Sequence, residues 1–315
     1  MDFERMVDDP APIRACADEE FAPPFELVES GPPRCPLVFS SPHSGDVYPA
    51  RFLAQTRLDA LTLRRSEDAH VDALFACAGE AGAPLLRARF PRAYLDLNRE
   101  PYELDPRMFE GPLPEFVNTR SLRVAAGLGT IPRVVADARE IYKGRLAVDE
   151  AIARVEALYK PYHATLRALM ERARRRFGLG VLIDCHSMPS AHVRDGAARC
   201  EGRRVDFVVG DRFGASCAPS LVDLVEDRLR GFGYSVRRNR PYAGGFITEH
   251  YGRPALGFHA VQIEISRGLY MNETTLAHGA RFDALAAHLT ELVRDLAREA
   301  LAGDFAQRPR QDAAE

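Results

Sequence analysis

Apolar and polar residues follow one another along the chain in blocks that predict alternating strands and helices. Short, nearly continuous apolar runs predict buried strands at residues 36–40, 85–90, 93–98, 180–186, 207–210 and 259–266. Apolar residues at helical spacing predict helices over residues 66–75, 149–175, 220–230 and 282–296. We expect Ser66 to cap the first of these helices and Pro161 to kink or split the second.

Strands that alternate with helices are typical of an α/β fold. The pattern therefore predicts a three-layer structure, with a mostly parallel or mixed sheet covered by helices on both faces. Residues 1–33 are rich in proline and acids and lack a sustained period, so we interpret them as an irregular lead-in. Residues 34–302 then form a single α/β domain without internal repeat or linker, and residues 303–315 form a disordered tail.

Composition narrows the classes of partner. The 315 residues include 42 Lys and Arg against 45 Asp and Glu, and the formal net charge of -3 gives no electrostatic reason to bind nucleic acid or an anionic membrane. Neither a secretion signal nor an apolar run of about 20 residues is present, so we expect a cytoplasmic protein. The six cysteines lack C-x-x-C spacing and are expected to be reduced thiols. Nothing in the pattern specifies an oligomeric state.

Two histidines, His43 and His186, lie directly after predicted strands. In α/β sheets, ligands bind beyond the carboxyl ends of the strands, so both residues are placed for function. Either histidine alone is more often a hydrogen-bonded structural residue. Together with the acids at residues 67 and 68 they favour a zinc site, because catalytic zinc commonly has three protein ligands and one open position.

The third ligand of such a site is open between several acids. Asp68 and Glu67 fall in the first turn of the predicted helix, where acids also simply complement the helix dipole. Asp46 follows His43 by three residues and is another candidate, as are His70 and Asp72. Spacing alone does not choose between them.

The alternation of side chains along a strand assigns faces to the residues around His186. Asp184 and His186 share one face of the strand, and Cys185 lies on the other. This arrangement disfavours a Cys–His nucleophilic pair and identifies Cys185 as a buried small apolar residue. Asp184 is placed to hold the second ring nitrogen of His186.

Glu264 lies in the middle of an apolar, β-branched strand. A carboxylate in that position is costly unless it is paired, solvated or used. One interpretation is a salt bridge to Arg267 or Arg99; the other is a general base that takes a proton from metal-bound water. Arginines in residues 89–92, 96–99 and 238–245 also suggest an anionic small substrate, because guanidinium groups bind carboxylates bidentately.

Taken together, the segments resemble the N-formylglutamate amidohydrolase (N-formylglutamate deformylase) family. The matching segments are SPHSG at residues 41–45, EDAHVD at 67–72, DLNR at 96–99, DCHS at 184–187, RPYAGGFIT at 240–248 and QIEI at 262–265. They occur in the order seen in that family and span roughly residues 36 to 271. The resemblance implies a fold related to zinc carboxypeptidases (phosphorylase/hydrolase-like), with the metal site at strand ends.

Carried over by position, the resemblance implies one zinc ion per chain, held by His43, His186 and an acid of the 67–68 pair, preferably Asp68. Glu264 then matches the catalytic glutamate. The substrate-binding positions implied by the resemblance are Arg92, Asn98, Arg99, Arg240 and Thr248.

The expected function is zinc-dependent hydrolysis of N-formyl-L-glutamate to formate and L-glutamate, the last step of one histidine degradation route. The substrate would be a small dianionic N-acyl amino acid. The alternatives are a related zinc deacylase or carboxypeptidase-like hydrolase that acts on another N-acyl amino acid, and a metal-stabilised carboxylate-binding protein without activity. A metal-independent Cys or Ser hydrolase is disfavoured by the orientation expected for Cys185.

Overall fold

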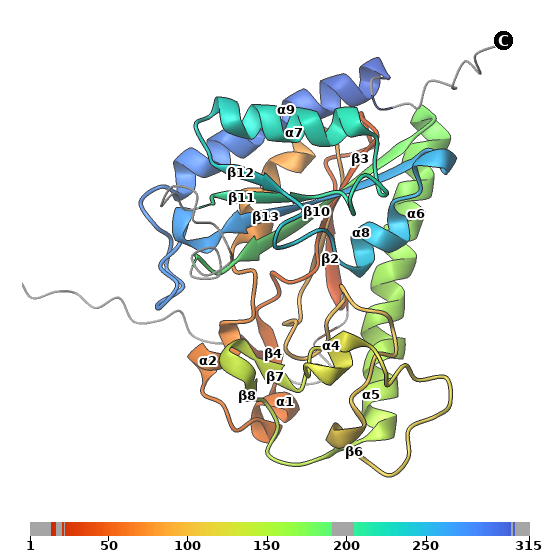
Figure 1. The fold of residues 1–315 in the computed structure, drawn as a ribbon, viewed down its shortest axis with the longest axis vertical. Helices are drawn as coiled ribbons and strands as arrows, with labels where there is room; N and C mark the ends of the chain where they lie inside the picture. The colour runs from red at the N-terminus through yellow and green to blue at the C-terminus, as the bar shows by residue number, and fades with distance from the viewer. Residues whose placement is uncertain (1–13, 17–20, 22, 191–204, 304, 306–315) are drawn as a thin grey trace, which may run out of the picture.

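A seven-stranded mixed sheet forms the centre of the computed structural model, which describes residues 14–16, 21, 23–190, 205–303 and 305 (Figure 1). Its strand order is β12-β11-β13-β10-β3-β5-β2. The bounds are β2 Phe25–Val28, β3 Leu37–Ser41, β5 Leu85–Ala88, β10 Gly180–Met188, β11 Phe207–Gly210, β12 Val236–Arg238 and β13 Phe258–Ser266. Strands β13, β10, β3 and β5 are parallel, whereas β2 pairs antiparallel with β5 and β11 pairs antiparallel with β13.

Helices cover both faces of this sheet, which confirms the three-layer α/β prediction. One face packs against α6 (Lys160–Phe177) and α8 (Phe246–Tyr251). The other packs against α3 (Val71–Leu74), α7 (Pro219–Gly231) and α9 (Phe282–Ala302), and α7 and α9 lie side by side there (Figure 1). The carboxyl ends of β3, β10 and β13 meet at one edge of the sheet.

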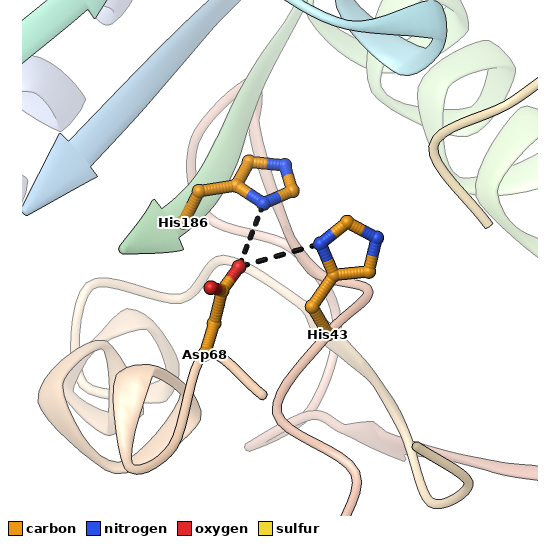
Figure 2. Close-up of side chains that lie close together, drawn as sticks. All are labelled: His43, Asp68 and His186. Carbon is orange, nitrogen blue, oxygen red and sulfur yellow. Dashed lines mark hydrogen bonds and ion pairs between the residues drawn. The ribbon is translucent and has the colours of Figure 1, made fainter. Parts of the chain in front are cut away.

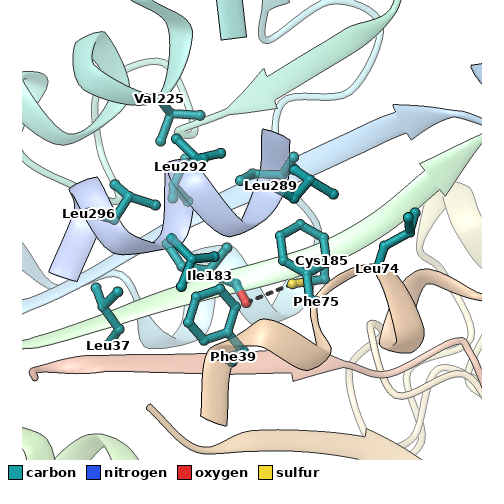
Figure 3. Close-up of a cluster of buried hydrophobic side chains, with 14 of the residues drawn as sticks. Leu37, Phe39, Leu74, Phe75, Ile183, Cys185, Val225, Leu289, Leu292 and Leu296 are labelled. Atoms are coloured by element: carbon teal, nitrogen blue, oxygen red, sulfur yellow. Dashed lines mark hydrogen bonds between the residues drawn. The ribbon is translucent and has the colours of Figure 1, made fainter. Parts of the chain in front are cut away.

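Side-chain parity along β10 agrees with the sequence prediction. Leu182 belongs to the core under α6, whereas Ile183 and Cys185 belong to the core under α7 and α9. Figure 3 shows Cys185 in that second core, near Phe75 and Leu74, with its thiol donating to the carbonyl of Ile183 at 3.5 Å. Cys185 therefore contributes packing on the face opposite His186.

The long helical segment predicted over residues 149–175 is present with a break near its middle. It consists of α5 (Val148–Arg154), one π-helical turn (Val155–Tyr159) and α6, and Pro161 lies in the first turn of α6. Proline has no N–H to donate, and its ring clashes with the carbonyl four residues earlier in a regular α-helix. The break in the helix therefore lies directly before Pro161, where the turn is wider.

Short elements between β3 and α5 gather at one end of the molecule, beyond the carboxyl edge of the sheet (Figure 1). Their bounds are β4 Val47–Pro49, α1 Ala50–Gln55, α2 Ala60–Arg64, β6 Phe109–Glu110, α4 Leu122–Ala125, β7 Val134–Val135, β8 Arg139–Glu140 and β9 Leu146–Ala147. β4 pairs with β1, Arg14–Cys16. Of these elements, α4 and β7 contribute lining residues to the site described below.

Three local predictions were wrong or incomplete. Ser66 does not cap a helix, because its hydroxyl donates to the carbonyl of Leu63. His70 has a left-handed backbone (φ 65°), so α3 begins only at Val71. Residues 93–98 form turns instead of a strand, because the N–H of Asp96 donates to Thr130 O across to another loop. The interpretation of residues 1–33 as irregular missed β2, which is held at the sheet edge by pairing with β5.

In the part of the chain that the structure describes, no helix combines the length and apolarity that a membrane crossing requires. Cys35, Cys77, Cys185 and Cys217 are free thiols. The tail predicted at residues 303–315 falls almost entirely outside the described residues, as does most of the lead-in.

Candidate metal centre and active site

Three side chains predicted as zinc ligands meet at the carboxyl edge of the sheet. One carboxylate oxygen of Asp68, Oδ2, lies 3.0 Å from Nδ1 of His186 and 3.3 Å from Nδ1 of His43 (Figure 2). One potential ligand atom from each residue falls within 4.8 Å of the others, and all three residues are buried. This set is therefore a candidate metal centre.

Backbone contacts fix the loops that carry this set. His43 lies in the turn after β3, and its carbonyl accepts the N–H of Asp68 at 2.9 Å. The hydroxyl of Ser44 donates to the carbonyl of Asp68 at 3.1 Å, which ties the two loops together a second time. Gly45 lets the first loop pass close to the neighbouring chain, since a Cβ there would lie 2.2 Å from Phe90 O.

Each histidine turns its other ring nitrogen toward a carboxylate. Nε2 of His43 lies 2.8 Å from Oδ1 of Asp96, and Nε2 of His186 lies 3.1 Å from Oδ2 of Asp184. A carboxylate that accepts the proton of Nε2 leaves the lone pair of Nδ1 for a metal, as in carboxylate–histidine–zinc arrangements. Nε2 of His186 also lies 3.2 Å from Nδ2 of Asn98. Nδ1 of His43 is also buried without a hydrogen-bond partner in the described structure. The donor set thus fits a zinc ion.

Asp68 is held so that only one of its oxygens faces the histidines. Oδ1 accepts from the hydroxyl of Ser187 at 3.0 Å and from Nη2 of Arg267 at 3.2 Å. Burial alone would raise the pKa of Asp68, but the hydrogen bond from His186 and the imidazole of His43 beside the carboxylate hold that pKa well below its usual range. Burial opposes protonation of His186, yet Asp184 and Asp68 hold its pKa well above the ordinary value. The two pKa directions show that the carboxylates of Asp68 and Asp184 stabilise a positive charge at the metal centre.

The other candidates for the third ligand have different partners. Glu67 accepts from the hydroxyl of Tyr48 at 2.6 Å and from Nε of Arg64, on the far side of its turn. The remaining three are engaged elsewhere: Asp46 with Arg14, His70 with Leu276 O and Asp72 with Arg87. Of the acids that the sequence left open, Asp68 is the one grouped with the two histidines.

Glu264 stands beside His186, because these residues are register partners in the β10–β13 ladder. Its carboxylate accepts from Nε2 of Gln262 at 2.8 Å, and the described structure shows no ion pair to it. Arg267, expected as a possible salt-bridge partner, pairs with Asp68 instead. Burial raises the pKa of Glu264 to about 8, against the opposing charges of His186 and Arg92. A carboxylate with such a pKa can exchange protons near neutral pH.

A cavity of about 590 Å³ opens over the metal centre. Arg92, Asn98 and Arg99, which the sequence placed in the substrate site, line it together with Glu264. Arg240 is exposed and lies outside the lining residues, so its expected role stays a prediction. Thr248 is fully buried beneath the site, where its hydroxyl lies 3.4 Å from both Asp184 and Gln262.

Sequence reasoning missed Asp96 as the support of His43. The Asp-x-Asn spacing is the available signal, since the carboxylate of Asp96 accepts the N–H of Asn98 at 2.9 Å in a turn that aspartate favours. The amide oxygen of Asn98 in turn accepts the N–H of Ile247 at 2.8 Å. Gly245 permits this contact, because a Cβ there would lie 2.3 Å from the Asn98 amide.

Comparisons of the sequence with a family model and with known proteins agree on one family. A family model described as N-formylglutamate amidohydrolase matches residues 35–271. The chain is 34% identical over 253 residues to an N-formylglutamate deformylase of Pseudomonas putida, covering 76% of this chain and 84% of the relative. It is 33% identical over 273 residues to an N-formylglutamate deformylase of Pseudomonas aeruginosa, covering 85% of this chain and 92% of the relative.

Solved structures agree with the sequence comparisons. A crystal structure of N-formylglutamate amidohydrolase from Ralstonia eutropha JMP134 is 40% identical, with a TM-score of 0.83, covering 89% of this chain and 99% of that one. A gene product of Agrobacterium tumefaciens has the same fold at 21% identity, with a TM-score of 0.63 over 91% of this chain and 98% of that one.

Proposed function

This chain belongs to the N-formylglutamate amidohydrolase family, and we propose that it hydrolyses N-formyl-L-glutamate to formate and L-glutamate with one zinc ion per chain. The reaction would be the last step of one histidine degradation route in the cytoplasm. The observation that carries the proposal is the buried His43, Asp68 and His186 cluster at the base of a cavity that also contains Glu264 and several arginines.

His43, Asp68 and His186 would hold the zinc, with Asp96 and Asp184 keeping both imidazoles oriented. When bound, zinc supplies Lewis acidity toward the formyl oxygen and lowers the pKa of water. The hydrogen bonds of Ser187 and Arg267 to Asp68 Oδ1 reserve the other oxygen of that carboxylate for the ion.

Glu264 would act as the general base and then the general acid. Its carboxylate takes one proton from the attacking water as the C–O bond forms, and then delivers that proton to the nitrogen, so that the C–N bond can break. Burial keeps its proton affinity high enough for both transfers. Gln262 keeps the carboxylate in place through its 2.8 Å hydrogen bond.

Arg92 would position the substrate. Its Nη2 donates to Asp96 Oδ2 at 2.7 Å, and about a quarter of its side chain remains exposed to the cavity. Its charge also acts on Glu264, which places it close to the reaction centre. A guanidinium held in this way can bind a substrate carboxylate and orient the scissile bond for attack.

Steady-state kinetics with N-formylglutamate, N-formylaspartate and N-acetylglutamate test this function. We expect the highest kcat/KM with N-formylglutamate. A higher value with N-acetylglutamate would identify a deacylase of another specificity, since one methyl group changes discrimination by only about 1–3 kcal/mol. Binding of all three compounds without turnover by the zinc-loaded protein would instead identify a carboxylate-binding protein.

A further inference from the structure

Five arginines line the cavity over the metal centre, and the described structure gives four of them acidic partners. The lining arginines are Arg65, Arg92, Arg99, Arg123 and Arg267. Two pair with Asp96, one with Asp68, and one lies 3.9 Å from the exposed Asp137. Only Arg123 has neither a side-chain hydrogen bond nor an ion pair among the described residues.

Arg99, which the family resemblance placed at the substrate, is used to hold the cavity wall together. Its Nε donates to Leu128 O and its Nη1 to Asn98 O, both at 2.8 Å. Its Nη2 lies 3.7 Å from Asp96. These contacts join the turn that carries Asn98 to the loop after α4, so little of this guanidinium remains for a ligand.

Arg123 lies on α4, in a wall segment with a defined position. The hydroxyl of Ser121 caps α4 by accepting the N–H of Val124 at 3.1 Å, and Val124 is buried. The chain beyond α4 runs so close to Glu103 that a Cβ at Gly129 would lie 2.2 Å from its carbonyl oxygen. A half-buried cation is thus presented to the cavity from a fixed backbone.

The electrostatics of the wall also favour an anion. Burial lowers the pKa of Arg99, and the charges of Arg92 and Arg123 lower it further, against the attraction of Asp96. Three guanidinium groups therefore repel one another at one side of the cavity. A carboxylate between Arg123 and its neighbours would relieve this repulsion.

We propose that Arg123 binds the side-chain carboxylate of the substrate, while Arg92 binds the carboxylate next to the scissile amide. The proposal rests on the proposed function and extends it to the choice between dianionic and monoanionic formyl amino acids. The charge of Arg92 interacts with Asp68 and Glu264 at the reaction centre, whereas that of Arg123 acts on Arg99 in the cavity wall. Arg92 and Arg123 are two different cations of the cavity lining, one for each of the two carboxylates of an N-acyl glutamate.

The test compares N-formylglutamate with N-formylglutamine, which lacks only the side-chain charge. Arg123→Ala should raise KM for N-formylglutamate about 10- to 100-fold with kcat little changed, the loss expected for one charged hydrogen-bonding partner. Kinetics with N-formylglutamine should stay within about twofold of the wild type. Arg123→Lys should recover part of the affinity, because it restores the charge without the planar fork.

Arg120→Ala is the matched control, since Arg120 is exposed three residues earlier and does not line the cavity. It should leave both substrates unaffected. Equal losses on both substrates in Arg123→Ala, or no loss on either, would overturn the proposal, as would a selective loss that appears only in Arg65→Ala.

Calorimetry of glutarate binding tests the role of Arg123 independently of whether the protein hydrolyses N-formylglutamate. If the zinc-loaded wild type does not hydrolyse N-formylglutamate, the proposed function fails. Weaker binding of glutarate, with unchanged binding of butyrate, in Arg123→Ala would still support a dicarboxylate site at Arg123. Unchanged binding of glutarate would contradict it.

Discussion

The imidazole of His43 and the carboxylate of Asp96 meet at 2.8 Å, between Nε2 and Oδ1. The same carboxylate accepts from Arg92 at 2.7 Å and from the N–H of Asn98 at 2.9 Å. Arg92, Arg99 and His43 together hold the pKa of Asp96 well below its usual range, although burial opposes them. One aspartate therefore orients a metal-ligand histidine, a substrate-facing arginine and the turn between them.

Asp96→Asn should weaken zinc binding about 10- to 100-fold, as removal of a carboxylate that orients a ligand histidine commonly does. The measurement is competition for zinc against a chromophoric chelator, made on the folded protein. Asp105→Asn is the matched control: Asp105 is equally buried and pairs with Arg107 and Arg133 outside the metal centre. Equal zinc affinities in Asp96→Asn and wild type would contradict the orienting role.

Glu264→Gln should lower kcat about 10²- to 10⁴-fold and leave zinc binding unchanged, because the amide keeps the shape of the side chain and cannot accept a proton. The contact with Gln262 can be retained through the amide oxygen. Single-turnover kinetics and zinc titration measure the two effects separately. Glu226→Gln, at a buried glutamate on α7 paired with Arg238, should keep full activity. Retained turnover in Glu264→Gln would exclude the general-base role.

Cys185→Ala should keep kcat within about twofold of the wild type, since the thiol lies on the face of β10 away from the metal centre. Burial raises the pKa of this thiol well above its ordinary value, so no thiolate forms there at neutral pH. Removal of the buried sulfur should cost about 1 kcal/mol in the free energy of unfolding. Loss of activity without loss of zinc or stability would instead point to a cysteine nucleophile.

His163 should make the fold sensitive to mild acid. It is buried on α6, with one ring nitrogen 2.9 Å from Leu97 O and the other 3.0 Å from the hydroxyl of Tyr251. Burial lowers its pKa from 6.5 to about 3, so the folded protein keeps it neutral while the unfolded chain protonates it below pH 6.5. Its stabilising contribution is complete above pH 6.5 and falls as the pH drops toward 3.

Urea unfolding at pH 7 and pH 5 measures this contribution. The wild type should lose about 2 kcal/mol between these values through His163 alone. In His163→Gln, the amide replaces the ring nitrogens as hydrogen-bond donor and acceptor but does not titrate. The loss of unfolding free energy between pH 7 and pH 5 should therefore be smaller by that amount. The same difference between the two pH values in both proteins would contradict the assignment.

The predictable part of the site follows from strand geometry. His43 and His186 could be placed together because both follow strands, and alternation along β10 put Asp184 beside His186 and Cys185 away from it. The same alternation along residues 259–266 predicted on which face of its strand Glu264 lies. A period of two residues survives in any strand whose two faces are both buried, so these assignments did not depend on tertiary detail.

The rest depends on contacts between distant loops. Asp68 was assigned to a helix that does not form there, because the left-handed His70 and the hydrogen bond to His43 O shape that turn instead. The role of Arg267 beside Asp68 and the free guanidinium of Arg123 likewise follow from where loops meet. Local sequence patterns carry no signal for such pairings.

The metal dependence of formate release tests the account most directly. The purified protein should contain about one equivalent of zinc per chain, lose turnover of N-formylglutamate when a chelator strips the metal, and regain it on addition of about one equivalent of zinc. Full turnover of N-formylglutamate by protein verified to be metal-free would contradict the account.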